Sequence, residues 1–317
     1  MNARRKSSRA FTLIELAVAM GLSILLSSVV ISLYTEIGKN YRYDERYALM
    51  QENGRYALQS ISADLSMADF WGRVIATDTV STTITPGTGS CEESINLFDA
   101  TAGLLINNYH PASPTLQFTP CTSVSSVHQT NTSMLIVKRV AGSTTAQADL
   151  ANGTVYLRTN GTTGSLLDDL TSSDAPGANE SDWLYQPSWY FIRQFYDVPA
   201  DAIPSLCRMR LSGNTLETPQ CLAEGIQDLH VQFGIDTDSD GHANQYLSEP
   251  TQAQVATAVT ARIFVLARSS DTDSFYTNDK TYTLGDVSLG PFNDGFLRRV
   301  YSSTVVLRNT IGRSLIN

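Results

Sequence analysis

The sequence predicts an α+β protein, in which a long N-terminal helix, membrane-spanning in its first half, packs on a C-terminal antiparallel β-sheet domain. Residues 11–69 contain no proline, and the first 24 of them are mostly apolar and carry a single charge. From residue 35 onwards apolar residues recur at helical spacing, as on a helix that packs by one face. From residue 133 onwards β-branched and aromatic runs are bounded by Gly and Asn, which is typical of strands.

The first part of the predicted helix is long enough to cross a membrane once. Its 24 residues would rise about 36 Å as a helix, against a hydrocarbon core of about 30 Å. Cations precede it and no small-x-small cleavage site ends it, so it is not a conventional secretory signal. The positive-inside rule keeps the N-terminus in the cytoplasm. We therefore expect a cytoplasmic leader (1–10), a transmembrane half-helix (11–34), an amphipathic half-helix (35–72) and a β-rich domain on the far side (73–317).

The residues around the start of this helix carry a specific motif, Arg9-Ala10-Phe11-Thr12-Leu13-Ile14-Glu15. It resembles the leader and mature N-terminus of type IV pilins and pseudopilins. The resemblance implies that prepilin peptidase cleaves between Ala10 and Phe11 and methylates the new amine of Phe11. The family normally has Gly before the Phe. Ala10 keeps a small residue there, so we expect cleavage.

Glu15 is the single charged residue between Phe11 and Tyr34. A charge inside a spanning segment costs at least a few kcal/mol and usually marks a partner. One interpretation is a carboxylate that reaches the headgroups or is neutral in the membrane. The other is that its charge is retained because it meets a cation. The resemblance to pilins favours the second and implies that the cation is the Phe11 amine of a neighbouring subunit in a filament.

The composition fits an extracytoplasmic domain. The chain has 317 residues, with 22 basic and 31 acidic side chains and a formal charge of −9. Loss of Arg4, Arg5, Lys6 and Arg9 with the leader would give −13 (−9 − 4). Because binding to phosphate backbones needs a basic surface, no nucleic-acid partner is expected.

The four cysteines are Cys91, Cys121, Cys207 and Cys221. An even number outside the cytoplasm predicts two structural disulfides. Three connectivities are open. We favour Cys91–Cys121 and Cys207–Cys221, because each pair brackets a loop-rich stretch. Neither pair has the CxxC spacing of a redox or zinc motif.

Three stretches narrow the resemblance to the PilW family of minor pilins. They are 54–72, in which Phe70-Trp71 would pack against the sheet and Gly72 would end the helix; 221–236; and the ending 298–309. Strand 229–235 alternates apolar and polar residues, which predicts a half-buried strand. Arg298, Arg299 and Arg308 are expected on the solvent side. Further strands are expected at 133–140, 154–158, 189–193, 206–211, 215–217, 257–268 and 296–308, with loops and short strands at 73–130 and a loop at 159–179.

One constellation has the chemistry of a metal site: Asp236, Asp238, Asp240 and Asn244, with Gly241 between the last two. Alternating carboxylates followed by Gly can wrap a hard cation such as Ca²⁺. The twelfth position is Leu247 rather than Glu, so the run is not an EF-hand, and we expect weak affinity, roughly 10⁻⁴–10⁻³ M. The alternative is an acidic turn between two strands. No other cofactor is expected.

The sequence has no GxSxG, HExxH, Walker A or dinucleotide-binding motif, so we expect a structural protein rather than an enzyme. The resemblance to PilW implies a minor pilin that helps initiate type IV pilus assembly, near the pilus tip. It would be a single-pass inner-membrane precursor and then part of an extracellular pilus. Its implied partners are other minor and major pilins, prepilin peptidase and the inner-membrane assembly platform. Alternatives are a J-like minor pseudopilin of type II secretion, a surface adhesin that uses the pilin leader and, least favoured, a periplasmic enzyme.

Overall fold

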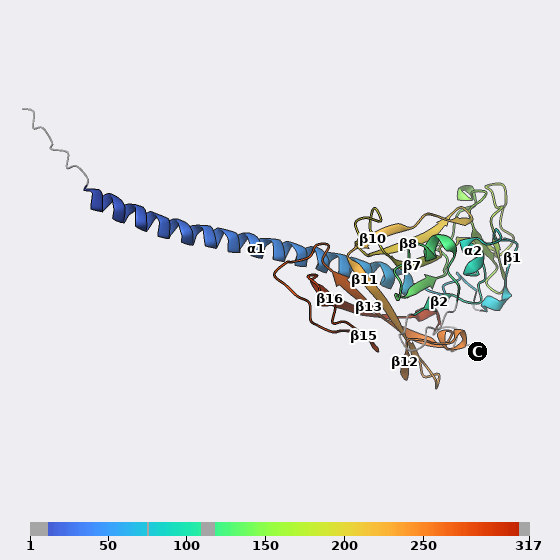
Figure 1. The fold of residues 1–317 in the computed structure, drawn as a ribbon. Coiled ribbons are helices and arrows are strands. Elements are labelled where there is room, and N and C mark those ends of the chain that lie inside the picture. Colours follow the sequence, from blue (N-terminus) through green and yellow to red (C-terminus); the bar gives the residue numbers. More distant parts are fainter. Residues whose placement is uncertain (1–11, 75, 109–117, 311–317) are drawn as a thin grey trace, which may run out of the picture. The chain divides into compact units, whose positions relative to one another are not determined.

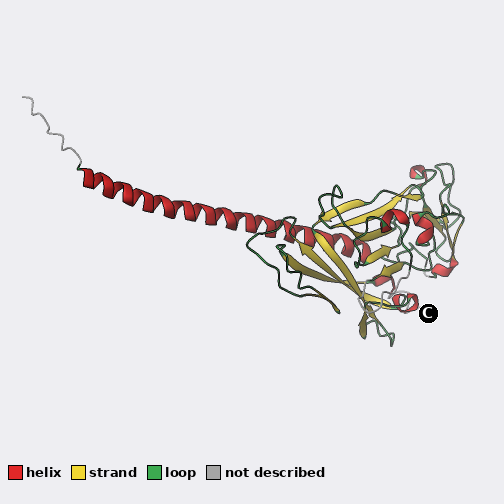
Figure 2. Cartoon of the chain, viewed as in Figure 1, coloured by secondary structure: helices red, strands yellow, loops and turns green. Residues whose placement is uncertain are grey.

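The computed structural model describes residues 12–74, 76–108 and 118–310. The chain divides into two compact units between Ala48 and Leu49. One helix, α1 (Leu13–Ser66), crosses that division, and all strands belong to the second unit (Figures 1 and 2). The predicted α+β class is therefore confirmed.

Within the second unit, the end of α1 is part of the core. Its buried residues are Met50, Gly54, Ala57, Ile61, Asp64 and Leu65. All of these except Asp64 belong to the predicted apolar face, which consists of Tyr47, Met50, Gly54, Ala57, Leu58, Ile61, Leu65 and Ala68. The helix contacts two different sheets. Gly54 meets the ring of Tyr301, where a Cβ would come within 2.5 Å of a ring carbon, and the Asp64 carboxylate accepts a hydrogen bond from the Tyr190 hydroxyl at 2.6 Å.

The prediction that the helix continues to Gly72 is wrong, because α1 ends at Ser66. The last turn tightens, since the Met67 and Ala68 N–H groups donate to carbonyls three residues earlier. Asp69 then adopts a positive φ of 62°, and its N–H donates to the Lys138 carbonyl at 3.1 Å. A tertiary hydrogen bond has thus replaced the next helical one.

The strands form three larger sheets and a hairpin, antiparallel except for the β1–β5 pair. The first sheet has the order β1 (Val80–Thr82), β5 (Gly164–Leu167), β4 (Tyr156–Thr159), β6 (Ser181–Leu184). The second is β10 (Gln220–Glu224), β8 (Ser205–Ser212), β7 (Ser188–Arg193), β3 (Met134–Val137), β2 (Leu104–Asn107), with β9 (Thr215–Leu216) paired to β8. The third is β12 (Gln245–Leu247), β11 (Ile226–Ile235), β13 (Ala258–Arg268), β16 (Arg298–Val306), and the hairpin is β14 (Tyr282–Leu284) with β15 (Val287–Leu289).

Short helices lie in the connections. They are α2 (Cys91–Ser94), α3 (Thr122–Ser125), α4 (Gln252–Val255) and the 3₁₀ turns η1 (Thr77–Thr79) and η2 (Gln147–Asp149). Each segment that the sequence predicts as a strand contains a strand in the structure. The predicted loop 159–179 contains β5, so that prediction is wrong in part.

Strand β11 is buried on both faces, which corrects the expectation of a half-buried strand. It packs against β7 and β8 of the second sheet, and its polar residues His230 and Gln232 are 2% and 8% exposed. Arg298 also departs from expectation. Its side chain is 1% exposed and forms an ion pair with Asp294, because it is enclosed between the rings of Phe292 and Phe296.

The aromatic pair after α1 packs in the core, as predicted. Trp71 is 1% exposed and stacks on Tyr185 with ring centroids 5.6 Å apart, while Phe70 meets the edge of Trp183. Two disulfides support this region and the second sheet, Cys91–Cys121 and Cys207–Cys221. This is the connectivity that the sequence favoured.

Candidate functional site

The N-terminus of α1 is closed by reciprocal hydrogen bonds between Thr12 and Glu15. The Thr12 N–H donates to the Glu15 carboxylate at 2.9 Å, and the Glu15 N–H donates to Thr12 Oγ1 at 3.3 Å. This is a capping box, so Glu15 stabilises its own helix. The Thr-x-x-Glu spacing of Thr12 and Glu15 is itself a sequence signal for such a cap. Ala10 and Phe11, the predicted cleavage and methylation positions, lie outside the described residues.

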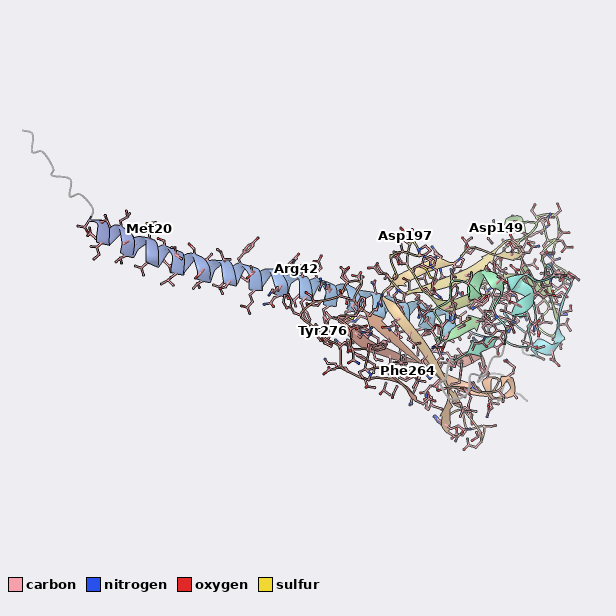
Figure 3. The ribbon with its side chains drawn as sticks, in the orientation of Figure 1. Met20, Arg42, Asp149, Asp197, Phe264 and Tyr276 are labelled. Atoms are coloured by element: carbon pink, nitrogen blue, oxygen red, sulfur yellow. A yellow bond between two sulfur atoms is a disulfide. The ribbon has the colours of Figure 1, made fainter. Side chains whose placement is uncertain are left out.

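The first half of α1 has the properties of a membrane span. It has the length and apolar composition to cross a bilayer, and side chains such as Ile24 and Leu26 are about two-thirds exposed, at 67% and 68%. An apolar surface of this kind is normally covered by lipid or by other helices. Met20 lies in this part of the helix, where side chains project on both sides of the ribbon (Figure 3).

Four hydroxyl side chains in this half of the helix form hydrogen bonds within the helix itself. The hydroxyls of Ser23, Ser28, Ser32 and Thr35 each donate to a carbonyl three or four residues earlier, at 2.8 Å. Such bonds remove the cost of an unpaired hydroxyl in hydrocarbon. The serine-containing stretch is therefore compatible with a bilayer.

Asp64 holds the second half of α1 against the sheet domain. Besides Tyr190, it accepts hydrogen bonds from Arg139, with Arg139 Nη2 at 2.9 Å from the carboxylate. Burial raises the pKa of Asp64, but hydrogen bonds from Tyr190, Ser188 and Arg139 outweigh that effect, and the pKa is lowered. The result is a buried, ionised carboxylate at the helix–sheet junction, which helical periodicity does not reveal.

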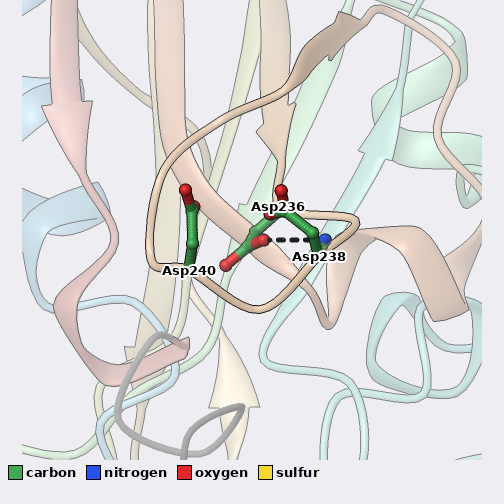
Figure 4. Close-up of side chains that lie close together, drawn as sticks. All are labelled: Asp236, Asp238 and Asp240. Atoms are coloured by element: carbon green, nitrogen blue, oxygen red, sulfur yellow. Dashed lines mark hydrogen bonds between the residues drawn. The ribbon is translucent and has the colours of Figure 1, made fainter.

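The predicted cation-binding run forms a loop after β11 (Figure 4). Carboxylate oxygens of Asp236, Asp238 and Asp240 lie within 4.8 Å of one another. Oxygens that each lie 2.3–2.6 Å from one Ca²⁺ ion would be at most about 5 Å apart, so these three carboxylates fit the ion. Asn244 has another contact: its side-chain oxygen accepts a hydrogen bond from the Thr237 N–H at 2.7 Å. It therefore closes the loop.

Backbone groups also stabilise the Asp236 carboxylate. It accepts hydrogen bonds from the backbone N–H groups of Asp238, Ser239 and Gly241, with N···O distances of 3.2, 2.7 and 2.8 Å. Desolvation raises the pKa of Asp236, but these donors lower it more. The arrangement is that of an acidic turn whose first carboxylate is ionised.

A histidine, a serine and a carboxylate meet between β11 and the β14–β15 hairpin. His230 Nε2 lies 3.0 Å from Ser248 Oγ and 2.9 Å from Asp286 Oδ1, and Ser248 Oγ donates to Asp286 at 2.5 Å. In a catalytic triad the carboxylate holds Nδ1 while Nε2 faces the serine. Here both groups meet Nε2, so the arrangement is not a triad. It fastens the hairpin turn to β11.

The structure thus has one long helix, apolar in its first half, whose second half packs in a mainly antiparallel β-sheet domain. Residues 189–309 match the PilW family, Type IV Pilus-assembly protein W. This stretch starts in β7 and ends just after β16. The chain is also similar to a type IV-like pilin from Thermus thermophilus, with a TM-score of 0.35 and 10% identity over 82% of this chain and 96% of that chain. No curated protein matches it. The family match supports a pilus-related pilin, and the apolar helix fits a membrane anchor.

Proposed function

We propose that this protein is a minor pilin that helps initiate type IV pilus assembly, near the pilus tip. The observation that carries the proposal is the match of residues 189–309 to the PilW family. The exposed apolar half of α1 supports it, because a surface suited to lipid is also suited to lateral packing against other apolar helices. Its partners would be other minor and major pilins, prepilin peptidase and the inner-membrane assembly platform.

Deletion of the gene tests the proposed role against its alternatives. A minor pilin that initiates assembly predicts loss of surface pili, restored by the gene on a plasmid. Normal pili with lost attachment would instead identify an adhesin. Normal pili with lost protein secretion would identify a J-like pseudopilin of a type II secretion system. Either of the last two results contradicts the proposal.

Maturation is tested by the intact mass of the protein from cells with and without prepilin peptidase. We propose cleavage between Ala10 and Phe11 and methylation of the Phe11 amine. The expected mass is that of residues 11–317 plus one methyl group, in cells with the peptidase only. A leader retained in both strains would make the chain a permanent membrane anchor and would overturn the filament role.

Glu15 is proposed to attract the Phe11 amine of a neighbouring subunit in addition to capping α1. Two variants separate these functions. Glu15→Gln can keep the capping box, because Gln also occupies that position, but it removes the charge; Glu15→Ala removes both. If the charge matters, both variants assemble few or no pili, although the Gln variant accumulates normally in the membrane. Piliation by Glu15→Gln at the wild-type level would show that only the cap is needed.

A further inference from the structure

A cavity of about 570 Å³ lies beside the loop between β7 and β8. Its size is that of pockets that hold small organic ligands. Residues after α3, in the β7–β8 loop, near the start of β11 and at the end of β13 line it. Its walls combine apolar side chains with amides and one cation, including Phe195, Pro199, Pro204, Gln129, Gln227 and Arg268.

The loop that forms one wall is held in place by Asp201. The Asp201 carboxylate accepts hydrogen bonds from the backbone N–H groups of Tyr196, Asp197, Val198 and Ile203, with N···O distances between 2.8 and 3.1 Å. The next residue, Ala202, has a φ of 49°, a conformation that costs of order 1 kcal/mol or more for a residue with a side chain. The wall is thus preformed, which reduces the entropy lost on binding.

Arg268 places a positive charge at this cavity. Its guanidinium lies 4.0 Å from the centre of the Phe296 ring, and its Nη2 donates to the Ala202 carbonyl at 2.7 Å. Within residues 12–74, 76–108 and 118–310 no carboxylate forms an ion pair with Arg268, and its buried Nε–H has no acceptor.

The group around Arg268 carries one positive charge in excess, because Arg268 and Arg298 both interact with the carboxylate of Asp294. Asp294 is held by both terminal nitrogens of Arg298, at 2.5 and 2.6 Å. Burial and the like charge of Arg298 lower the pKa of Arg268 to about 10, although the charge of Asp294 raises it in part, and Arg268 is therefore a cation at neutral pH. A partly buried cation without a paired anion is unfavourable, and a bound anion would relieve that cost.

We propose that this cavity binds a carboxylate carried on an apolar body about the size of an amino acid, with Arg268 as its counter-ion. Phe195, Pro199 and Pro204 would contact the apolar part, and the guanidinium would pair with the carboxylate. A polypeptide C-terminus and an acidic side chain share this chemistry. The inference does not depend on the proposed role in pilus assembly.

Calorimetric titration of the full chain in detergent tests the proposal with two matched pairs of probes. N-acetyl-leucine and its amide represent a C-terminus; N-acetyl-glutamate α-amide and N-acetyl-glutamine amide represent a side chain. We expect at least one acid to bind roughly tenfold or more tightly than its amide, a difference of about 1.4 kcal/mol, and the pair that shows it identifies the source. Equal binding of acid and amide in both pairs, or no binding of either acid at roughly 10 mM, would overturn the proposal.

Three variants connect such binding to this cavity. Arg268→Gln is expected to abolish the preference for the acid. Arg262→Gln, on the same strand and stacked on Tyr246, is the matched control and should bind like the wild type. Because Arg268 also packs on Phe296, Gln227→Glu provides a test that keeps this contact. Gln227 Oε1 accepts a hydrogen bond from Arg298 Nε at 2.7 Å, so a carboxylate there would pair with Arg298 and cancel the excess positive charge that Arg268 and Arg298 share beside Asp294. The variant should therefore raise the thermal unfolding temperature and weaken acid binding at least tenfold. Unchanged binding by this variant or by Arg268→Gln would contradict the proposal.

Discussion

At the scale of single residues, Asp228 shows how strongly this fold opposes a buried charge. The side chain is 9% exposed and lies in β11, next to a bulge in its pairing with β13. Burial raises the pKa of Asp228 to about 8, although the Leu229 N–H lowers it. The carboxyl group is therefore mainly protonated in the folded protein at pH 7, whereas an unfolded chain would ionise it near pH 4.

The difference between the pKa of Asp228 in the folded protein and in the unfolded chain predicts how stability changes with pH. Because the folded-state pKa is raised, the contribution of Asp228 is fully present below pH 4 and is lost as the pH rises towards 8. Asp228→Asn should remove that loss and be more stable than wild type at pH 8, by on the order of 4 kcal/mol, with a smaller difference at pH 5. Urea unfolding of the full chain in detergent at both pH values measures the difference in unfolding free energy between Asp228→Asn and the wild type.

The matched control is Asp279→Asn, because the Asp279 side chain is exposed. This variant should follow the wild type at both pH values. A gap between Asp228→Asn and wild type that stays constant from pH 5 to pH 8 would show that the substitution acts through packing rather than through ionisation.

At the scale of elements, the junction between α1 and the sheets depends on the Asp64 cluster. Asp64→Ala would leave the Tyr190 hydroxyl and the Arg139 guanidinium without their buried carboxylate. Loss of one partner from a buried ion pair typically costs 3–5 kcal/mol, so we expect a decrease of roughly 3 kcal/mol or more in the free energy of unfolding. Limited proteolysis should cut first near residues 66–74. Because the folded-state pKa of Asp64 is lowered, its contribution is present above pH 4 and is lost as the pH falls through the folded-state pKa.

Asp44→Ala is the control for Asp64→Ala. Asp44 is exposed on the same helix, and its removal should leave the unfolding free energy within about 0.5 kcal/mol of wild type. If Asp64→Ala unfolds at the same denaturant concentration as this control, the cluster does not hold the helix.

The loop after β11 holds three carboxylates whose oxygens lie within 4.8 Å of one another. We propose that Asp236, Asp238 and Asp240 bind Ca²⁺ weakly, with a Kd of roughly 10⁻⁴–10⁻³ M. Calorimetric titration with CaCl₂ should give a saturable signal that Asp238→Asn with Asp240→Asn removes, whereas Asp197→Asn keeps it. A wild-type protein without saturable binding up to about 10 mM Ca²⁺ would show that the carboxylates serve the turn alone.

At the scale of the whole molecule, the two disulfides close loops of different length. Cys91 and Cys121 are 30 residues apart and Cys207 and Cys221 are 14 apart. Loop-closure entropy predicts that removing the first costs about 3.6 kcal/mol and the second about 3.0. In addition, Cys207 and Cys221 face each other on paired strands, which keeps those segments together without the bond. Thermal unfolding of the two double Cys→Ala variants should therefore show the larger decrease for Cys91/Cys121. A larger decrease for the other pair would contradict the entropic argument.

Long periodic segments were predictable, because periodicity directly encodes which face is buried. The sequence predicts the apolar and amphipathic halves of α1, the apolar run of β3 and the aromatic run of β7. Short strands such as β5 carry too few residues for a pattern, and they form because β1 and β4 supply hydrogen-bond partners on both sides. The acidic loop was found from spacing, whereas the cavity beside Arg268 was not, because its lining residues come from four separated segments.

By itself, the sequence determined the anchor helix, the class of the fold and the pilin-like start of the chain, since each depends on residues that are neighbours along the chain. Tertiary structure decided which polar groups are buried and what satisfies them. Lys138, for example, follows an apolar strand and is 0% exposed, with its ammonium group bonded to the Asn96 and Asp99 carbonyls. Only the folded chain brings those acceptors to it, because the cost of burying a charge is offset by atoms that lie about 40 residues away in the sequence.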